Sequence, residues 1–267
     1  PMIIIGELDK RSGDAVEKVY TSIDAPIIRT SIKVAEMIKY VNNAFHGLKV
    51  CFANEIGNIC KKVGIDSHKV MEIFSMDTKL NLSAYYLKPG FAFGGSCLPK
   101  DLRALLYKGL REDLNLPLLS SILESNENQI KMGINLITRT KKKKIGILGF
   151  SFKGGTDDLR ESPMVELIER LLGKGYQISI YDKNVSLAKI FGANKQYIEK
   201  EIPHISSLMC SSIEEVLSRS QVLVIGNNSE EFKKIPELIR EDQTIIDLTR
   251  IVDGKGRARG KYEGICW

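Results

Sequence analysis

A cysteine near the middle of the chain follows a glycine-rich turn, and its neighbours are those of a reactive thiol. Residues 90–101 read GFAFGGSCLPKD, so Cys97 stands just before Pro99, Lys100 and Asp101. Proline suits the first turn of a helix, and the helix dipole favours a carboxylate there. Cys97 is therefore expected at a helix N-terminus beside a lysine, a setting that favours the nucleophilic thiolate. The alternative is a small buried cysteine, as most cysteines in folded proteins are.

Three polar residues recur at helical spacing inside a mostly apolar stretch. Lys39, Asn43 and His46 are separated by four and three positions, which places them on one face of a predicted helix. An ammonium group and an amide beside a thiolate would stabilise the oxyanion that forms when sulfur attacks a carbonyl carbon. The simpler interpretation is ordinary polar surface on a half-exposed helix, and His46 fits a buried core histidine equally well.

The segment 145–158, IGILGFSFKGGTDD, is similar to a dinucleotide-binding loop but departs from the strict pattern. That pattern is GxGxxG after a strand, with an acidic residue about 20 positions later. Here Gly146 and Gly149 are three apart, and bulkier residues fill the turn. Asp182 ends the next predicted strand, where a ribose-binding carboxylate would stand. An NAD site in this segment is therefore the weaker alternative.

Basic residues that follow predicted strands indicate a different ligand. Lys153 follows the first strand of this region, and Arg250 follows a later one. Ligands of parallel sheets bind at the carboxyl edge, to which both positions belong. Together with Arg160 they predict a diphosphate site, in which lysine acts as a point charge and arginine as a fork. Taken singly, each would be a solvated surface charge.

The elements that must position these residues follow from the apolar periodicity. An amphipathic helix is predicted from about Ile27 to Val63, with Pro26 at its start and Gly64 just past its end. It would be about 50 Å long, enough to bridge two domains or to pack against a second copy. Shorter helices are predicted at 67–75, 99–111 and 116–138.

Strands and helices alternate in the last part of the chain. The strands are predicted at 143–150, 177–182, 222–227 and 244–250, and the helices at 163–175, 212–220 and 232–240. Such alternation predicts a doubly wound parallel sheet, so the fold class is α/β. The basic run Lys141–Lys144 is interpreted as a solvated linker that feeds the first of these strands.

Three segments result from these elements. Residues 1–25 contain a short strand and a helix with too few neighbours for a domain, so they are expected to be the end of a larger N-terminal domain. Residues 26–139 are predicted to form a helical central domain built on the long helix. Residues 140–267 are predicted to form a Rossmann-like domain.

Bulk composition narrows the classes of function. The chain has 267 residues, 43% apolar and 27% charged, which fits a soluble protein of about two domains. It has no run of about 20 apolar residues and no signal peptide, so no membrane partner is expected. Its net charge of +6 is dispersed, which suits a phosphate-bearing small ligand better than nucleic acid. Five cysteines without a CxxC pair predict no metal site and a reducing cytoplasm.

Several segments resemble the UDP-glucose/GDP-mannose dehydrogenase family. They are GFAFGGSCLPKDLRAL, AEMIKYVNNAFHGLKVCFANEIGN and GFSFKGGTDDLRESP. The segments KLNLSAYYLKPGFAFGGSC, GANKQYIEKEIPHISSL and EGICW are most similar to its GDP-mannose branch. Family members carry a further N-terminal NAD-binding Rossmann domain of about 170 residues. The resemblance therefore implies that residues 1–25 are the remnant of that domain.

The resemblance implies a four-electron oxidation of a sugar C6 alcohol to a carboxylate, with NAD as the cofactor. Cys97 would form a thiohemiacetal and then a thioester with the sugar, as a covalent nucleophile does. Lys39 would stabilise the alkoxide and the oxyanion, and Asn43 would bind the same oxygen or a water. Asp101 would orient Lys39 or the hydrolytic water.

Further positions receive roles only from the resemblance. At the position of Lys88 the family often has an arginine that reaches the neighbouring subunit. Lysine keeps the positive charge there but cannot make the bidentate hydrogen bonds of a guanidinium. The long helix would form the core of a homodimer, and NAD would bind mostly outside this chain. The substrate-binding set is His46, Tyr85, Tyr86, Lys88, Phe91, Gly94, Lys153 and Arg250, and the cofactor-binding set is Gly95, Ser96 and Arg160.

Three functions remain open on the sequence. The first is oxidation of GDP-mannose to GDP-mannuronate, and the second is the same reaction on UDP-glucose. The third is a non-catalytic, dimeric module that binds nucleotide sugars. The chain alone is expected to bind nucleotide sugar weakly or not at all and not to turn over NAD.

Overall fold

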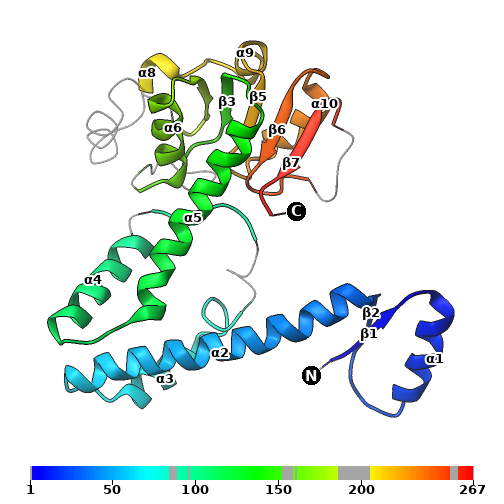
Figure 1. Ribbon diagram of the computed structural model, residues 1–267, viewed down its shortest axis with the longest axis vertical. Helices are drawn as coiled ribbons and strands as arrows, with labels where there is room; N and C mark the ends of the chain where they lie inside the picture. Colours follow the sequence, from blue (N-terminus) through cyan, green and yellow to red (C-terminus); the bar gives the residue numbers. More distant parts are fainter. Residues whose placement is uncertain are drawn as a thin grey trace. The chain divides into compact units, whose positions relative to one another are not determined.

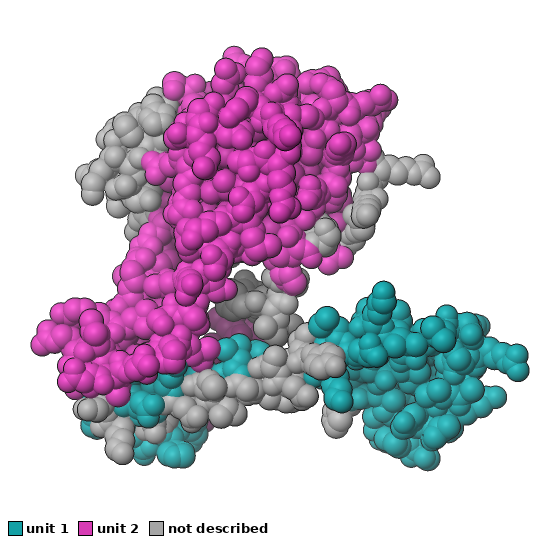
Figure 2. All heavy atoms as spheres, viewed as in Figure 1, with its two compact units in different colours: residues 1–73 teal, residues 74–267 magenta. Residues whose placement is uncertain are grey.

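The computed structural model describes residues 2–83, 89–95, 97–151, 159, 161–185, 205–252 and 258–266. The chain divides into two compact units, Pro1–Ile73 and Phe74–Trp267 (Figure 2). In the described part, no helix is both long and apolar enough to cross a membrane. The segment boundaries at 25/26 and 139/140 stay a prediction.

The first unit begins with a βαβ arrangement. Strand β1 (Ile3–Glu7) pairs in parallel with β2 (Ile27–Ser31), and helix α1 (Lys10–Tyr20) connects them (Figure 1). Reciprocal hydrogen bonds between Asp9 and Ser12 cap α1. The strand and helix predicted before residue 25 are therefore confirmed.

The long helix starts later than predicted. Residues Ile27–Ser31 form β2, and α2 runs over Ile32–Lys62, a length of about 46 Å. The residues of β2 satisfy a helical pattern, but pairing with β1 decides their conformation. Arg29 adds to this pairing because its guanidinium donates to Glu7 at 2.7 Å and also binds Asp14. Helix α3 (Ser67–Met76) follows and crosses the boundary between the units.

The second unit contains a pair of helices followed in sequence by a three-layer α/β structure. Helices α4 (Leu98–Arg111) and α5 (Pro117–Arg139) pack together and precede the sheet. The sheet has the order β4-β3-β5-β6-β7, and all its neighbouring strands are parallel. Its strands are β3 (Lys144–Leu148), β4 (Gln177–Tyr181), β5 (Val222–Ile225), β6 (Thr244–Asp247) and β7 (Lys261–Gly264). The predicted doubly wound parallel sheet is therefore confirmed.

Alternating side chains of the strands pack against helices on both faces of the sheet. On one face, Ile145 and Ile147 of β3 lie in a core with α5 and α6 (Pro163–Gly173) (Figure 1). On the other face, Leu148 packs with α9 (Ile213–Arg219) and with the short helices η1 (Glu230–Lys234) and α10 (Ile235–Leu238). Helix α8 (Ile205–Leu208) lies beside β4.

The basic run before β3 does more than link two elements. Its last residue, Lys144, starts β3 as predicted. The ammonium group of Lys142 donates to the Asp242 carbonyl and to Thr244 Oγ1, and that of Lys143 lies 4.1 Å from the centre of the Tyr176 ring. The interpretation as a solvated linker is therefore incomplete, since two of these lysines anchor the sheet.

An ion-pair cluster joins α5 to α6 and predicts a pH dependence. Arg170 binds Glu127 at 2.8 Å and also pairs with Glu166. Through hydrogen bonding and charge, the Arg170 guanidinium lowers the pKa of Glu127, while burial opposes the shift. Because the folded pKa is lowered, this stabilisation is complete above the ordinary value of 4.5 and is lost as the pH falls.

Glu127→Gln should therefore reduce the loss of unfolding free energy that the protein shows as the pH falls. Urea unfolding at about pH 7 and about pH 3.5 should show a difference smaller by roughly 0.5 kcal/mol in the variant, since a third of the side chain is exposed. Glu124→Gln, an exposed glutamate on the same helix, is the control and should keep the full difference. An unchanged difference in Glu127→Gln would contradict the assignment.

Candidate active site

Cys97 occupies the position expected from the sequence. It is the N-cap residue of α4, with Pro99 buried in the first turn, and its carbonyl accepts the backbone N–H of Asp101 at 2.9 Å. Cys97 is exposed. Gly95 has a φ of +82°, a left-handed conformation that glycine adopts without strain. The predicted placement of the thiol at a helix N-terminus is confirmed.

Asp101 lies on the surface of the first turn of α4. Its carboxylate is 3.4 Å from the ammonium group of Lys100, and both side chains are largely exposed. The lysine three positions after Cys97 is thus paired with the aspartate that follows it. The proposed role of Asp101 toward Lys39 or water stays a prediction.

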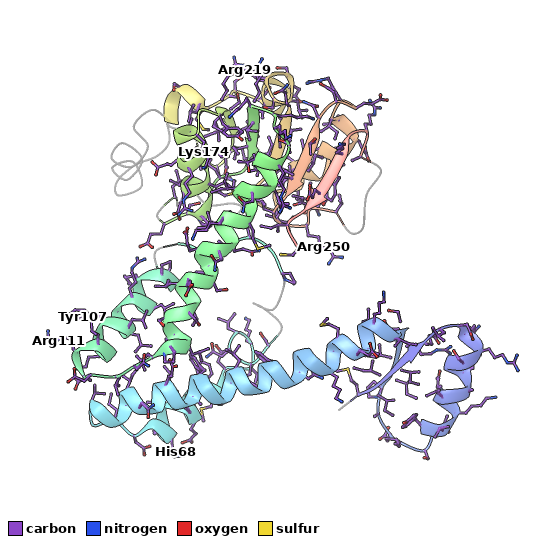
Figure 3. All side chains as sticks on the ribbon, in the orientation of Figure 1. His68, Tyr107, Arg111, Lys174, Arg219 and Arg250 are labelled. Carbon is purple, nitrogen blue, oxygen red and sulfur yellow. The ribbon has the colours of Figure 1, made fainter. Side chains whose placement is uncertain are left out.

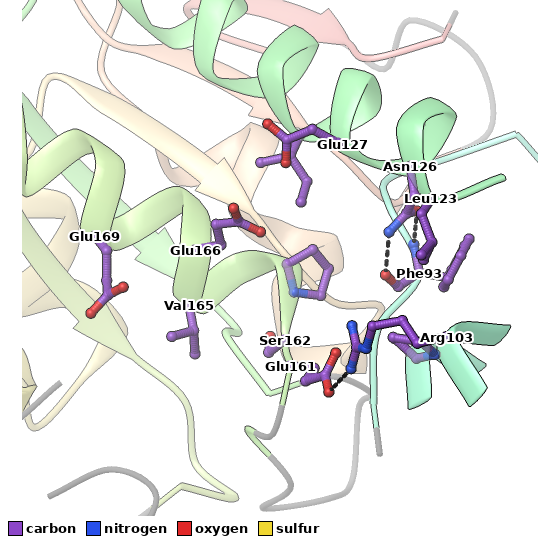
Figure 4. Close-up of a pocket in the computed structure, with 13 residues that line it drawn as sticks. Phe93, Arg103, Leu123, Asn126, Glu127, Glu161, Ser162, Val165, Glu166 and Glu169 are labelled. Carbon is purple, nitrogen blue, oxygen red and sulfur yellow. Dashed lines mark hydrogen bonds and ion pairs between the residues drawn. The ribbon is translucent and has the colours of Figure 1, made fainter. Parts of the chain in front are cut away.

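Helix α5 holds the loop that leads to Cys97. The side-chain amide of Asn126 bonds twice to Phe93, accepting its N–H and donating to its carbonyl, each at 2.8 Å (Figure 4). Gln129 donates to the carbonyl of Gly90 and lies 3.3 Å from the sulfur of Cys266. These contacts have no signal in the sequence, because the run SNENQ at 125–129 is typical of a solvated helix face.

The same loop packs tightly on its other sides. A Cβ atom at Gly94 would lie 2.2 Å from the carbonyl oxygen of Glu161 and 2.6 Å from Cδ of Pro163. The ring of Phe91 covers Gly133 of α5, where a Cβ would be 2.8 Å from the ring. Gly94 and Phe91 therefore have clear packing roles, and their contacts with substrate stay predictions.

A cavity of about 360 Å³ lies between α4, α5 and the start of α6. An ion pair between Arg103 and Glu161 crosses its edge and ties α4 to the loop before α6 (Figure 4). Phe93 and Pro99, on either side of Cys97 in sequence, both line this cavity. The position of the thiol is thus set by the second unit's own packing.

The buried carboxylate of Asp182 organises the loop after β3. Its Oδ2 accepts the backbone N–H groups of Phe150 and Ser151 at 3.1 and 3.2 Å, the Ser151 hydroxyl at 3.0 Å, and the Asn227 amide at 3.3 Å. Asp182 is 4% exposed. Its carboxylate is therefore turned into the protein, in an arrangement that does not suit the ribose contact considered from the sequence.

A second buried carboxylate shapes the turn that carries Arg250. Asp247, at the end of β6, accepts the backbone N–H groups of Thr249, Arg250 and Ile251, each at 2.9 Å, and the hydroxyl of Tyr262. Arg250 is exposed at the carboxyl end of the sheet, with a φ of +57° (Figure 3). Its predicted location at this edge is confirmed, and its contact with phosphate stays a prediction.

The polar line predicted on the long helix lies within α2. Lys39 is exposed on this helix, in the first unit. The side chains of Asn43 and His46 lie outside the described part of the structure. The approach of Lys39 to Cys97 stays a prediction.

Six predicted site residues lie outside the described residues, so their roles stay predictions. They are Tyr85, Tyr86, Lys88, Ser96, Lys153 and Arg160.

Four cysteines whose side chains the structure describes form no disulfide: Cys60, Cys97, Cys210 and Cys266. Cys60 and Cys210 are buried, at 6% and 8% exposure. Burial raises the pKa of the Cys210 thiol. Among the described residues, no group of three or more His, Cys, Asp and Glu side chains could hold a metal ion.

Comparison with known proteins identifies both parts of the chain. The family model "UDP-glucose/GDP-mannose dehydrogenase family, central domain" matches residues 33–128, and the model "UDP-glucose/GDP-mannose dehydrogenase family, UDP binding domain" matches residues 146–254. The first match includes Cys97 and the polar line on α2. The second includes Asp182 and Arg250.

Individual relatives agree with these matches. The GDP-mannose 6-dehydrogenase of Pseudomonas aeruginosa is 53% identical over 267 residues, which are 100% of this chain and 61% of that protein. A UDP-glucose 6-dehydrogenase of Bacillus subtilis is 32% identical over 257 residues, 95% of this chain and 55% of that protein. The crystal structure of a ternary complex of Pseudomonas aeruginosa GDP-mannose dehydrogenase superposes with a TM-score of 0.94 at 53% identity, over 100% of this chain and 61% of that one. This chain thus spans about three fifths of the length of the relatives it matches, and it belongs to the UDP-glucose/GDP-mannose dehydrogenase family.

Proposed function

We propose that this chain is the central and C-terminal part of a GDP-mannose 6-dehydrogenase, which oxidises GDP-mannose to GDP-mannuronate with two NAD+. The observation that carries the proposal is an exposed cysteine at the N-cap of α4, reached through a loop with two buried glycines. Identity of 53% with a GDP-mannose 6-dehydrogenase, against 32% with a UDP-glucose 6-dehydrogenase, favours GDP-mannose as the substrate.

The chemistry follows from what a thiolate does at a carbonyl carbon. Once the C6 alcohol is oxidised to an aldehyde, the sulfur of Cys97 adds to C6, and an electron pair moves to the oxygen to give a thiohemiacetal. Loss of hydride from C6 leaves a thioester. Water then adds at C6, the C–S bond breaks, and carboxylate and thiol are released. The covalent bond keeps the aldehyde bound between the two oxidations.

Other residues would stabilise the charges that develop in these steps. The start of α4 presents backbone N–H groups, and its dipole favours negative charge beside Cys97. Lys39 would approach the oxygen on C6 as a cation, and Asn43 would donate a hydrogen bond to that oxygen or to a water. Asp101 would hold Lys39 or the hydrolytic water in place.

The sheet edge of the second unit would hold the nucleotide sugar. Arg250 lies at the carboxyl edge, where ligands of parallel sheets bind. With Lys153 it would meet the diphosphate, and His46, Tyr85, Tyr86 and Phe91 would surround the sugar and base.

NAD+ would accept the hydride in both oxidations. The second sheet does not fit this cofactor, because Asp182 is buried and bonded to its own loop. We place the NAD site mainly in an N-terminal domain that precedes these residues in the whole enzyme. From this chain, Gly95, Ser96 and Arg160 would line the edge of the NAD site.

A homodimer through α2 is part of the proposal. Large apolar side chains are exposed along this helix, as expected of a face that a second copy covers. They are Val34, Met37, Phe45 and Leu48, which lie on one side of the helix at 3.6 residues per turn. The cytoplasmic location expected from the cysteine pattern stays a prediction.

Thiol labelling tests the nucleophile directly. With limiting iodoacetamide at about pH 7, Cys97 should react on the order of 10 times faster than Cys266, the other exposed described cysteine. Cys60 and Cys210 should react slowly because both are buried. Peptide mass spectrometry gives the four rates. Labelling of Cys97 no faster than Cys210 would contradict the proposal and favour the non-catalytic module.

Calorimetric titration distinguishes the substrates. GDP-mannose should bind this chain more tightly than UDP-glucose, although weakly for both. Tighter binding of UDP-glucose would overturn the choice of sugar nucleotide while leaving the reaction class intact.

A further inference from the structure

The side-chain amide of Asn126 makes both a donor and an acceptor hydrogen bond to the backbone of the loop before Cys97, as a paired strand does. One side chain satisfies both the N–H and the carbonyl of Phe93, at 2.8 Å each (Figure 4). A two-point contact fixes the orientation of the peptide as well as its distance, which a single hydrogen bond does not. Asn126 lies near the middle of the 23-residue helix α5, so it is itself a rigid anchor.

The two glycines that follow this contact are closely held. Phe93 is followed directly by Gly94, which abuts Glu161 and Pro163 so closely that a Cβ would collide with both. Gly95 then takes its left-handed conformation, and Cys97 begins α4. A shift of the Phe93 peptide would therefore drive Gly94 against the start of α6, and it would move Gly95, which lies two positions before Cys97.

We infer that Asn126 is a positioning residue for the Cys97 nucleophile, acting through the Phe93 peptide; this inference rests on the proposed function of Cys97. Its side chain touches the loop backbone and sets where the sulfur stands at the N-terminus of α4. Gln129, one turn further along the same face, holds the carbonyl of Gly90 and so fixes the beginning of the loop. Displacement of a reacting group by about 1 Å can cost 100-fold in rate, so a loop anchor of this kind has a kinetic effect.

The type of side chain matters for a reason that a variant series can test. Asparagine offers one acceptor and one donor at the spacing of a peptide group. Aspartate keeps the acceptor for the Phe93 N–H but places a second acceptor against the Phe93 carbonyl. Alanine removes both bonds. Reactivity of Cys97 should therefore fall in the order wild type, Asn126→Asp, Asn126→Ala.

The experiment measures alkylation of Cys97 by iodoacetamide as a function of pH, on this chain and its variants. Asn126→Ala should slow the reaction at about pH 7 on the order of 10-fold, and the shape of its pH profile should differ from that of the wild type. Asn128→Ala is the matched control, since it makes the same substitution on an exposed residue two positions away. It should leave the rate and the profile unchanged.

The outcomes separate the inference from the proposed function. An unreactive Cys97 in the wild type refutes the proposed function and the inference with it. A reactive wild type, with Asn126→Ala and Asn128→Ala alike in rate and profile, overturns only the inference. Slow labelling of buried Cys60 and Cys210 shows that a variant is folded. If Asn126→Ala exposes them, Asn126→Asp decides: a slowed Cys97 supports the inference and an unchanged one overturns it.

Discussion

Cys97→Ala is expected to lower the formation of NADH from GDP-mannose by about 10³-fold or more, the loss typical of removing a covalent nucleophile. The assay needs a chain that carries an NAD-binding domain in front of Pro1, for which the preceding segment of the Pseudomonas aeruginosa relative is suitable. Without a sulfur at the N-cap of α4, the aldehyde has no covalent anchor and the second oxidation has no thiohemiacetal to act on. Any residual reaction should yield at most one NADH per sugar and should release aldehyde, which a carbonyl trap detects.

The control removes a different thiol. Cys210→Ala takes a small buried side chain from the core around α9 and should leave the turnover number unchanged. Because Cys97→Ala changes one exposed atom, its unfolding midpoint in urea should equal that of the wild type. Two NADH per sugar from Cys97→Ala at a normal rate would refute the covalent mechanism.

The sequence predicts much of the fold where one periodicity is unambiguous. Helix α5 is long and the strands β3, β5 and β6 are almost entirely buried, and each appears close to its predicted place. Strand β2 is missed because its residues also satisfy a helical repeat, and only pairing with β1 decides between the two. Strand β7 is not predicted because it is a four-residue edge strand in which every second residue is exposed. Its sequence, KYEG, therefore has no apolar pattern that indicates a strand.

The candidate site shows the same division between local and non-local information. The helix start at Cys97 is encoded locally by Pro99 and the preceding glycines, and it is confirmed. The contact of Asn126 with Phe93 joins residues 33 positions apart, and a single asparagine in a polar run gives no sign of it. The position of Asp182 after a strand favours a ligand contact, but its carboxylate instead accepts N–H groups of the loop after β3.

The buried carboxylate of Asp247 accepts several hydrogen bonds from the short turn that follows β6. Its carboxylate is fully buried and accepts three consecutive backbone N–H groups, those of residues 249 to 251, as well as the hydroxyl of Tyr262. These bonds hold Arg250 in a left-handed conformation that a non-glycine residue adopts only when its surroundings impose it. They also join β6 to the edge strand β7, on which Tyr262 lies.

Asp247→Ala is therefore expected to cost about 3–5 kcal/mol in the free energy of unfolding, because four buried or part-buried donors lose this acceptor at once. Urea unfolding of the variant and the wild type measures the loss. Asp247→Asn should cost less, since its amide oxygen keeps part of the set while its NH2 group faces a donor. Asp242→Ala, which removes an exposed carboxylate paired with Arg240, should stay within about 0.5 kcal/mol of the wild type. Equal stabilities for Asp247→Ala and Asp242→Ala would show that the turn holds its shape without the carboxylate, and Arg250 would then need another explanation for its conformation.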